Sequence, residues 1–303
     1  MTDRTIQGQG RALCAKGLKK NYGSQQVLRD LDLTIEPGHI YGLIGRNGAG
    51  KTTLLSILTG QNTKNGGEVT YGGEPVWENP RALGDLCFAR ELNPSSEVAA
   101  LKVEEYLLAA KLFCPRWDAA YAGTLLKKFG LDTKKRISKL SKGQMSMVTI
   151  TAALASRAPV TILDEPAAGL DVVMRERFYR LLLDDYAETG RTFVISTHII
   201  EEAAGVFERV IVLDEGRIIA DAPTEELVDR FRYVSGSAAA VDKALADGPA
   251  PLQVQTVGAH KMAAIQGDGA LFERLAADPD LTLEGMSLQN VFVALCGHGD
   301  EEG

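Results

Sequence analysis

The amino-acid sequence predicts an α/β fold with a largely parallel sheet, because short aliphatic runs alternate with helical patterns. Residues 40–44, 160–163 and 193–196 are expected as buried strands, and residues 52–60 form the first helical pattern between them. The chain has 303 residues, of which 45% are hydrophobic and 24% charged. This composition indicates a globular protein with a full core, and it excludes the disordered, collagen-like and fibrous classes.

Two further regions are expected to extend this core. Residues 12–35 carry period-2 segments on both sides of a Tyr-Gly turn, which predicts an antiparallel edge sheet. Between residues 94 and 159 the patterns are almost wholly helical, with candidate helices at 104–111, 118–129 and 143–155. We expect these helices to form an insertion within the α/β unit.

A domain boundary is expected near residue 221. Residues 210–213 and 217–220 predict a last strand pair, joined by the turn-forming sequence Asp-Glu-Gly. Beyond it, residues 222–303 hold 5 Lys and Arg against 13 Asp and Glu, whereas residues 1–221 hold 28 against 27. This shift in charge predicts a main domain over 1–221 and an acidic C-terminal extension over 222–303.

The acidic extension is expected to be a small α+β module. Alternation over residues 252–257 predicts a short strand, and residues 281–295 predict a capped amphipathic helix that docks on the main domain. A regulatory role, a dimer-stabilising role and a degenerate extension all fit these residues.

Charge and cysteine content exclude several classes of protein. The net charge of −7 argues against binding to nucleic acid. The cysteines are scattered without a CxxC pair, so neither a zinc knuckle nor a disulfide framework is expected, and a reducing cytoplasm is the default compartment. No apolar run approaches the ~18 residues that span a bilayer, and the start of the chain lacks a signal-peptide pattern. We therefore expect any membrane role to act through another chain, at the cytoplasmic face.

A phosphate-binding loop is expected directly after the first buried strand. Residues 45–52, Gly-Arg-Asn-Gly-Ala-Gly-Lys-Thr, match the pattern GxxxxGK[ST] at every fixed position and precede a helical pattern. Glycines let backbone N–H groups turn toward phosphates, Lys51 adds a positive charge, and Thr52 supplies a hydroxyl for Mg²⁺. The pattern predicts a P-loop NTPase core. The expected nucleotide contacts are Gly45, Asn47, Gly48, Ala49, Gly50, Lys51, Thr52 and Thr53.

Two carboxylates complete the expected site. Asp164 and Glu165 follow the aliphatic run at 160–163, where a buried strand delivers acids at its C-terminal end. Asp164 is the predicted contact to Mg²⁺. Glu165, one residue further, is the predicted group that polarises a water for attack on the γ-phosphate.

The segment between these motifs is more restrictive, since several NTPase families share the motifs themselves. Residues 140–144, Leu-Ser-Lys-Gly-Gln, resemble the Leu-Ser-Gly-Gly-Gln signature of the ATP-binding-cassette (ABC) family and depart from it at Lys142. The resemblance implies a head-to-tail dimer, in which this segment of one subunit faces the γ-phosphate bound by the other subunit. The residues that the resemblance implies at this composite site are Ser141, Gly143 and Gln144.

Other positions fit the same family. Tyr22 is similar to the aromatic residue that stacks on adenine, although packing on the edge sheet is an alternative role for it. Residues 168–171, Ala-Gly-Leu-Asp, resemble the loop that crosses the dimer interface, with Asp171 at its end. His198, in the sequence Ser-Thr-His, is similar to the switch histidine that contacts the γ-phosphate. The resemblance therefore implies Lys51, Glu165 and His198 as the catalytic set.

One position departs from the family pattern in an informative way. The family usually places a glutamine that contacts Mg²⁺ after a strand near the start of the helical insertion. Here the sequence Leu-Cys-Phe-Ala-Arg-Glu puts Glu91 at that place, or Arg90 if the register shifts by one residue. A carboxylate is also a ligand for Mg²⁺, but its extra negative charge changes the coupling chemistry expected here.

Within the family, the sequence looks most like the ATPase subunits of ABC-2-type exporters of the bacitracin-resistance and acetoin-utilisation branch. The similarity lies in residues 114–118, the Leu-Ser-Lys-Gly form of the signature, and residues 287–295. It implies ATP and Mg²⁺ as cofactors, a separate ABC-2-type integral-membrane permease as partner, and a second nucleotide-binding subunit, with a homodimer favoured. Trp117 fits equally a permease contact and packing within its own subdomain. The alternative function is a soluble ATP-gated ABC protein that acts on a non-membrane partner.

Overall fold

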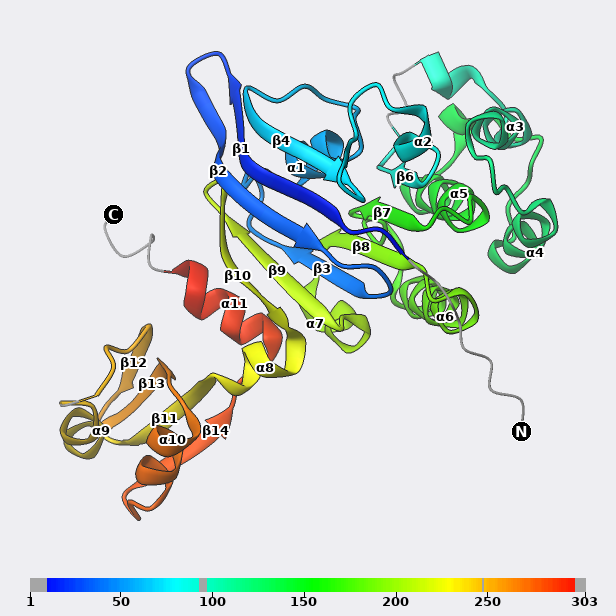
Figure 1. Ribbon diagram of the computed structural model, residues 1–303. Coiled ribbons are helices and arrows are strands. Elements are labelled where there is room, and N and C mark those ends of the chain that lie inside the picture. The colour runs from blue at the N-terminus through cyan, green and yellow to red at the C-terminus, as the bar shows by residue number, and fades with distance from the viewer. Residues whose placement is uncertain (1–9, 93–96, 247, 298–303) are drawn as a thin grey trace, which may run out of the picture. The chain divides into compact units, whose positions relative to one another are not determined.

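The computed structural model describes residues 10–92, 97–246 and 248–297, and the chain divides into two compact units (Figure 1). Unit 1 comprises residues 1–198 and 213–218, and unit 2 comprises residues 199–212 and 219–303. The elements of unit 1 are β1 (Leu13–Tyr22), β2 (Gln25–Ile35), β3 (Ile40–Ile44), α1 (Lys51–Leu58), β4 (Gly66–Tyr71), β5 (Glu74–Pro75), α2 (Pro80–Leu83), β6 (Leu86–Ala89), α3 (Val103–Phe113), α4 (Ala119–Phe129), α5 (Lys142–Ala155), β7 (Val160–Asp164), α6 (Val172–Thr189) and β8 (Thr192–Thr197). Short 3₁₀ turns cover Glu97–Ala100 and Ile137–Lys139.

Four strands of unit 1 form a parallel sheet that carries the core. The order is β3, β8, β7, β6, and each neighbouring pair is parallel. All residues of β3, β7 and β8 are buried, which explains their continuous aliphatic sequences. The register pairs Ile44 with Thr197 and Asp164 with Ser196, so the carboxyl ends of the three buried strands meet at one edge. The strands predicted at residues 40–44, 160–163 and 193–196 are confirmed.

The predicted antiparallel edge sheet is also confirmed. β1 pairs with β2 through a turn after Tyr22, and β4 and β5 extend the sheet in the order β2-β1-β4-β5. Apolar residues on alternate positions of β2, including Leu31, Leu33 and Ile35, are buried and account for the period-2 pattern.

The three helices predicted between residues 94 and 159 are present as α3, α4 and α5, which lie together in Figure 1. Asp118 begins α4 as its N-cap, since its carboxylate accepts a hydrogen bond from the backbone N–H of Tyr121. Gly130 ends α4 with a φ of 62°, a conformation that glycine adopts without strain. The predicted start of this insertion at residue 94 lies outside the described residues.

A buried ion-pair network ties α6 to the helical region. Asp185 in α6 has a fully buried side chain and binds the Arg191 guanidinium through both carboxylate oxygens, at 2.8 Å each. Arg157, at the end of α5, lies 3.1 Å from Asp185 and 3.2 Å from the Asp118 carboxylate. A buried carboxylate needs such partners, because an unpaired charge in the core costs several kcal/mol.

Unit 2 contains α7 (Ile200–Ala203), α8 (Thr224–Asp229), β11 (Phe231–Ser237), α9 (Ala238–Leu245), β12 (Gln253–Val257), β13 (His260–Gln266), α10 (Gly269–Ala276), β14 (Leu281–Gly285) and α11 (Leu288–Cys296). The strands β9 (Arg209–Asp214) and β10 (Arg217–Pro223) cross the division between the units and contain the predicted strand pair.

The predicted α+β module is a split βαβ arrangement. Its four strands have the order β12-β13-β11-β14 with antiparallel neighbours, and α9 and α10 supply Val241 and Leu275 to its core. The prediction of one helix over residues 281–295 is wrong in its first part. Residues 281–285 form β14, because Leu281 pairs with Gly236 of β11 and is buried in this core. The helix α11 begins only after Ser287, which caps it.

Candidate functional site

The chain leaves β3 through a tight loop that only glycine allows at its key positions. A Cβ atom on Gly45 would lie 2.3 Å from the carbonyl oxygen of Leu213, so no larger residue fits there. Gly48 and Gly50 have φ values of 85° and 107°, and Gly50 is the N-cap of α1. The loop therefore turns directly into a helix N-terminus, which is the arrangement that binds phosphate.

Lys51 places its positive charge inside this loop. Its side chain is 7% exposed, and its Nζ donates to the carbonyl oxygen of Gly45 at 2.7 Å and lies 3.6 Å from Oε1 of Glu165. The loop encloses a cavity of about 240 Å³. The cavity is lined by Val27, Arg46, Asn47, Gly48, Gly50, Lys51, Thr52, Thr53 and Glu165. A buried amine beside inward-turned backbone suits a polyphosphate.

The hydroxyl of Thr52 and the carboxylate of Asp164 meet at the cavity. Thr52 Oγ1 donates to Asp164 Oδ2 at 2.6 Å, and Ser196 Oγ donates to the other carboxylate oxygen at 2.5 Å. Thr52 lies in the first turn of α1 and Asp164 ends β7, so two separate elements supply the two oxygens. These oxygen ligands fit Mg²⁺, which binds proteins through one or two carboxylates and retains several waters.

Glu165 holds its two carboxylate oxygens toward different partners. Oε2 lies 2.7 Å from Nδ1 of His198, while Oε1 faces Lys51. Its φ of 50° is unusual for a residue with a side chain, and its backbone N–H donates to Ser196 Oγ at 2.9 Å. The side chain is 21% exposed, so a water has access to it. The structure thus brings together the predicted set of Lys51, Glu165 and His198.

Ser196 is a functional residue that the sequence interpretation missed. It is fully buried in β8, and its hydroxyl connects the side chain of Asp164 to the backbone of Glu165. Ser196 pairs with Asp164 in the neighbouring parallel strand. This pairing could have indicated its role, but it is known only once the strand register is known.

The signature segment leads into α5, and its backbone and side-chain hydrogen bonds cap the start of that helix. Ser141 is the N-cap: its Oγ accepts from the Gln144 backbone N–H at 3.2 Å, and Gln144 Oε1 accepts from the Ser141 N–H at 3.1 Å. A Cβ atom on Gly143 would lie 2.7 Å from the carbonyl oxygen of Gly169, so this glycine permits close packing. Asp171 caps α6 by accepting from Met174 N–H at 2.8 Å. The roles of these residues toward a second subunit stay predictions.

Tyr22 lies at the end of β1 with half of its surface exposed. Its hydroxyl accepts a hydrogen bond from Asn62 Nδ2 at 2.6 Å, and the Lys20 Nζ lies 4.9 Å from the ring centroid. These two contacts hold the ring in place while half of the Tyr22 surface stays exposed.

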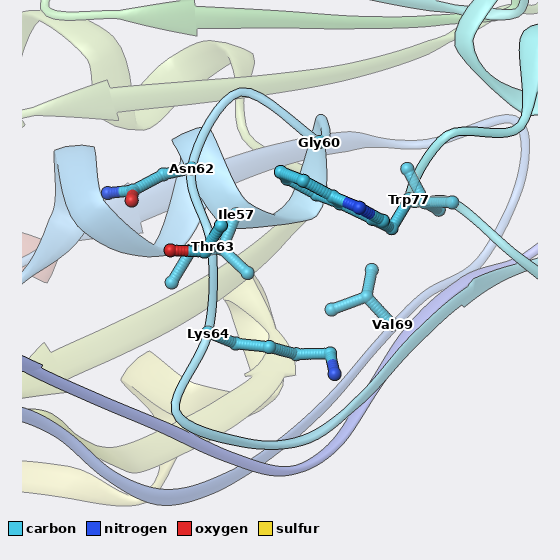
Figure 2. A pocket seen from close by; sticks show the side chains of 8 residues that line it. Ile57, Gly60, Asn62, Thr63, Lys64, Val69 and Trp77 are labelled. Carbon is cyan, nitrogen blue, oxygen red and sulfur yellow. The ribbon is translucent and has the colours of Figure 1, made fainter.

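Asn62 also lines a second cavity, of about 300 Å³, at the C-terminal end of α1 (Figure 2). Ile57, Val69, Val76 and Trp77 give it apolar walls. Its lining and that of the phosphate-loop cavity have no residue in common, so the two cavities are distinct.

Glu91 lies two residues beyond the end of β6, and its carboxylate lies 3.2 Å from Nζ of Lys142. Both side chains are about half exposed. The two positions that depart from the ABC pattern are therefore partners of each other. The predicted contact of Glu91 with Mg²⁺ stays a prediction.

The chain is similar in sequence to known ATP-binding proteins of transporters. A family model described as ABC transporter matches residues 28–168. The chain is 33% identical over 222 residues to the Nod factor export ATP-binding protein I of Burkholderia lata, covering 71% of each protein. It is 34% identical over 223 residues to the aliphatic sulfonates import ATP-binding protein SsuB of Rhodopseudomonas palustris, covering 71% of this chain and 75% of that protein. The ABC transporter ATP-binding protein YtrB of Bacillus subtilis is 28% identical over 214 residues, covering 71% and 73%.

Solved structures agree with the fold. An ATP-binding subunit of an ABC transporter superposes with a TM-score of 0.62 at 26% identity, covering 71% of this chain and 91% of that one. A dimeric ATP-binding cassette bound to ADP and Pi shares the fold at 24% identity, with a TM-score of 0.61 and coverage of 70% and 98%. Within the described part of the chain, no helix has the length and apolar content needed to span a membrane. The chain belongs to the ATP-binding proteins of ABC transporters and is an ABC transporter ATPase.

Proposed function

We propose that two copies of this chain bind two Mg-ATP molecules head to tail and drive a separate permease of the ABC-2 exporter type. The observation that carries the ATPase part is the cluster in which Lys51, Asp164 and Glu165 converge on the phosphate loop. ATP-driven transport by a nucleotide-binding subunit is the activity of the family.

Each residue of the cluster has a distinct task in this proposal. Lys51 and the loop N–H groups bind the β- and γ-phosphates, and Tyr22 stacks on adenine. Thr52 and Asp164 would hold Mg²⁺, which would supply positive charge to the phosphate oxygens. Glu165 accepts a proton from the attacking water, and His198 orients the Glu165 carboxylate.

The second subunit completes the site in this proposal. Ser141, Gly143 and Gln144 stand at the N-terminus of α5, where the backbone N–H groups favour an anion. If this end of one subunit binds the γ-phosphate held by its partner, a head-to-tail pair contains two complete sites.

A mixture of two defective variants tests this composite site. Lys51→Ala and Ser141→Ala should each be inactive alone, because each homodimer damages both of its sites. A mixed dimer keeps one site intact, so an equimolar mixture should recover about a quarter of wild-type ATP turnover when subunits pair at random. Ser141→Thr keeps the hydroxyl and the helix cap, and serves as the control. A mixture as inactive as its components would contradict the composite site.

The surface proposed for the permease lies on α3. Leu108, Leu112 and Phe113 are 59%, 78% and 83% exposed, so they form an apolar edge on the helical region. Trp117, which the sequence interpretation considered for this role, is half-buried, and its backbone N–H donates to the carbonyl oxygen of Cys114. Large exposed apolar side chains suit an interface, since burying them is the main gain in protein association. We expect a cytoplasmic segment of the permease to cover this edge.

Export is the proposed direction on the likeness of the chain to ABC-2-type ATPases in residues 114–118 and 287–295. The relatives named above include one export and one import protein, so direction needs its own test. Capture with the Glu165→Gln protein and Mg-ATP from solubilised membranes should recover a multi-spanning permease. Leu112→Asp with Phe113→Asp should lose it, and Leu183→Asp, an exposed apolar residue on α6, should keep it. ATP-dependent accumulation of cargo inside inverted vesicles supports export, whereas accumulation only in right-side-out vesicles contradicts it.

A further inference from the structure

Two cysteines meet where the helical region joins the parallel sheet. Cys87 lies in β6 and Cys114 is the C-cap of α3. Their thiols are hydrogen-bonded to each other, and the Cys87 thiol is also hydrogen-bonded to Ser156. Both residues are half-buried. Neither lines the phosphate-loop cavity.

Contacts on either side of Cys114 fix this juxtaposition. Arg116 lies 2.8 Å from the Asp85 carboxylate, and its Nη1 donates to the carbonyl oxygen of Gly84 at 3.2 Å. The backbone N–H of Asp118 donates to the carbonyl oxygen of Ala155 at 2.8 Å. The segment after α3 is therefore held against the residues that precede β6, which keeps the two sulfur atoms together.

The surroundings make the two thiols unequal. The hydrogen bond from Cys114 lowers the pKa of Cys87 to about 7, with Ser156 and the positive charge of Arg191 acting in the same direction and burial opposing them. The same hydrogen bond raises the pKa of Cys114. Tyr106 also faces the pair, and burial raises its pKa to about 12, so it stays neutral. One thiol is thus a thiolate nucleophile near neutral pH and the other a protonated neighbour.

We propose that Cys87 and Cys114 form a reversible disulfide when a hydroperoxide oxidises the protein. The Cys87 thiolate attacks one peroxide oxygen, the O–O bond breaks, and an alcohol leaves with a proton from solvent, which gives a sulfenic acid on Cys87. The Cys114 sulfur then attacks the sulfur of Cys87 as its own proton departs, and water leaves. Two thiols are oxidised to one disulfide, and one hydroperoxide is reduced to an alcohol and water. A dithiol reductant restores both thiols.

The link would tie together the walls of a cavity that lies beside β6 and α3. This cavity of about 550 Å³ is lined by Gln61, Phe88, Ala89, Arg90, Glu91, Leu92, Val98 and Tyr106. All but Gln61 lie between the two cysteines, within the segment 88–113 that the disulfide would close into a loop. The oxidised protein therefore holds the end of α3, where Cys114 lies, to β6 more tightly than the reduced protein does.

Peptide mapping tests the disulfide directly. The full-length chain is treated with hydrogen peroxide, remaining thiols are alkylated, and tryptic peptides are identified by mass. We expect peptide 82–90 joined to peptide 112–116, with release by dithiothreitol. Cys14→Ser, which removes a cysteine of β1, should keep the link. Recovery of the two peptides separately, each alkylated or each oxidised to a sulfinic acid, would overturn the proposal.

The pH dependence of alkylation tests the pairing without oxidation. In the wild-type chain the reaction of Cys87 with iodoacetamide should reach half its maximal rate near pH 7. Cys114→Ala removes the donor and should move this midpoint upward by about one pH unit or more. Cys114→Ser keeps a hydroxyl donor, so it should keep the low midpoint while losing the linked peptide. An unchanged midpoint in Cys114→Ala would show that the thiols do not interact and would overturn the pairing.

Discussion

Asp164 and the pair of Glu91 with Lys142 differ in how the fold holds their charges. Asp164 ends a buried strand, is 7% exposed and has both carboxylate oxygens in hydrogen bonds, to Thr52 and Ser196. Glu91 and Lys142 face each other at 3.2 Å from a loop and a helix start, and water reaches both side chains. The backbone and the core fix the place of Asp164, whereas a screened Coulomb attraction holds Glu91 beside Lys142. Substitution of Asp164 should therefore change the chemistry of the site, and substitution of Glu91 or Lys142 should change stability and activity little.

The exposed pair also explains how two departures from the family pattern coexist. At position 91 glutamate in place of glutamine adds a negative charge. At position 142 lysine in place of glycine adds a positive charge. Because the two side chains are paired, the local net charge equals that of the family pattern. Neither departure alone would have this property.

The largest effect on ATP affinity is expected at the buried amine of Lys51. Lys51→Ala should weaken ATP binding by about 30-fold or more, since it removes a desolvated charge worth about 2–5 kcal/mol to its partner. Titration with a fluorescent ATP analogue measures this. Lys64→Ala, at an exposed lysine of the second cavity, should leave the affinity unchanged. If the two variants bound the ATP analogue with equal affinity, Lys51 would not be a nucleotide-binding residue.

The next effect is expected at Ser196, which acts through its neighbours. Ser196→Ala should lower kcat by about tenfold with little change in KM. The substitution removes the hydrogen bonds of the Ser196 hydroxyl with the Asp164 carboxylate and the Glu165 backbone N–H, and this loss costs about 1–3 kcal/mol. Steady-state ATPase kinetics give both constants. Thr149→Ala removes a buried hydroxyl whose partner is a carbonyl of its own helix, so it should leave kcat unchanged. A rise in KM without a fall in kcat would argue against the positioning role.

Asp118 lies between the two extremes in exposure, and its effect depends on pH. The hydrogen bond from the Tyr121 N–H, then the Arg157 side chain, holds the pKa of this carboxylate below its usual range. Its stabilising contribution is therefore present above about pH 4, the unfolded pKa, and is lost as pH falls through the lower folded pKa. Asp118→Ala should cost about 1 kcal/mol at pH 7 through the lost cap. Urea unfolding at pH 7 and pH 2.5 should show the difference shrinking in acid; a constant difference would contradict this account.

The smallest effect is expected for the exposed pair. A double-mutant cycle with Glu91→Gln and Lys142→Gly should give a coupling energy below about 1 kcal/mol that falls further in high salt. Urea unfolding of the four proteins measures it. A coupling above about 2 kcal/mol, or one insensitive to salt, would show that the pair is not merely a screened surface contact.

The sequence predicted those parts of the site that depend on local patterns. The glycine spacing of the phosphate loop, the acids at the end of β7 and the helical patterns of α4 and α5 follow from residues close in sequence. Contacts between distant residues were not predictable, because they depend on strand register and helix packing. Ser196 with Asp164, Glu91 with Lys142, and Cys87 with Cys114 are such contacts. The strand β14 was missed for the same reason, since pairing with β11 overrides a helical pattern.

Glu165→Gln tests the central claim, that this carboxylate activates water for ATP hydrolysis between two subunits, most directly. The variant should bind ATP as the wild type does, lose at least about 100-fold in turnover, and accumulate as a dimer with Mg-ATP by light scattering. Glu176→Gln, at an exposed residue of α6, is the matched control and should behave as wild type. Near-normal turnover in Glu165→Gln, or a monomer that hydrolyses ATP at the wild-type rate, would contradict the account.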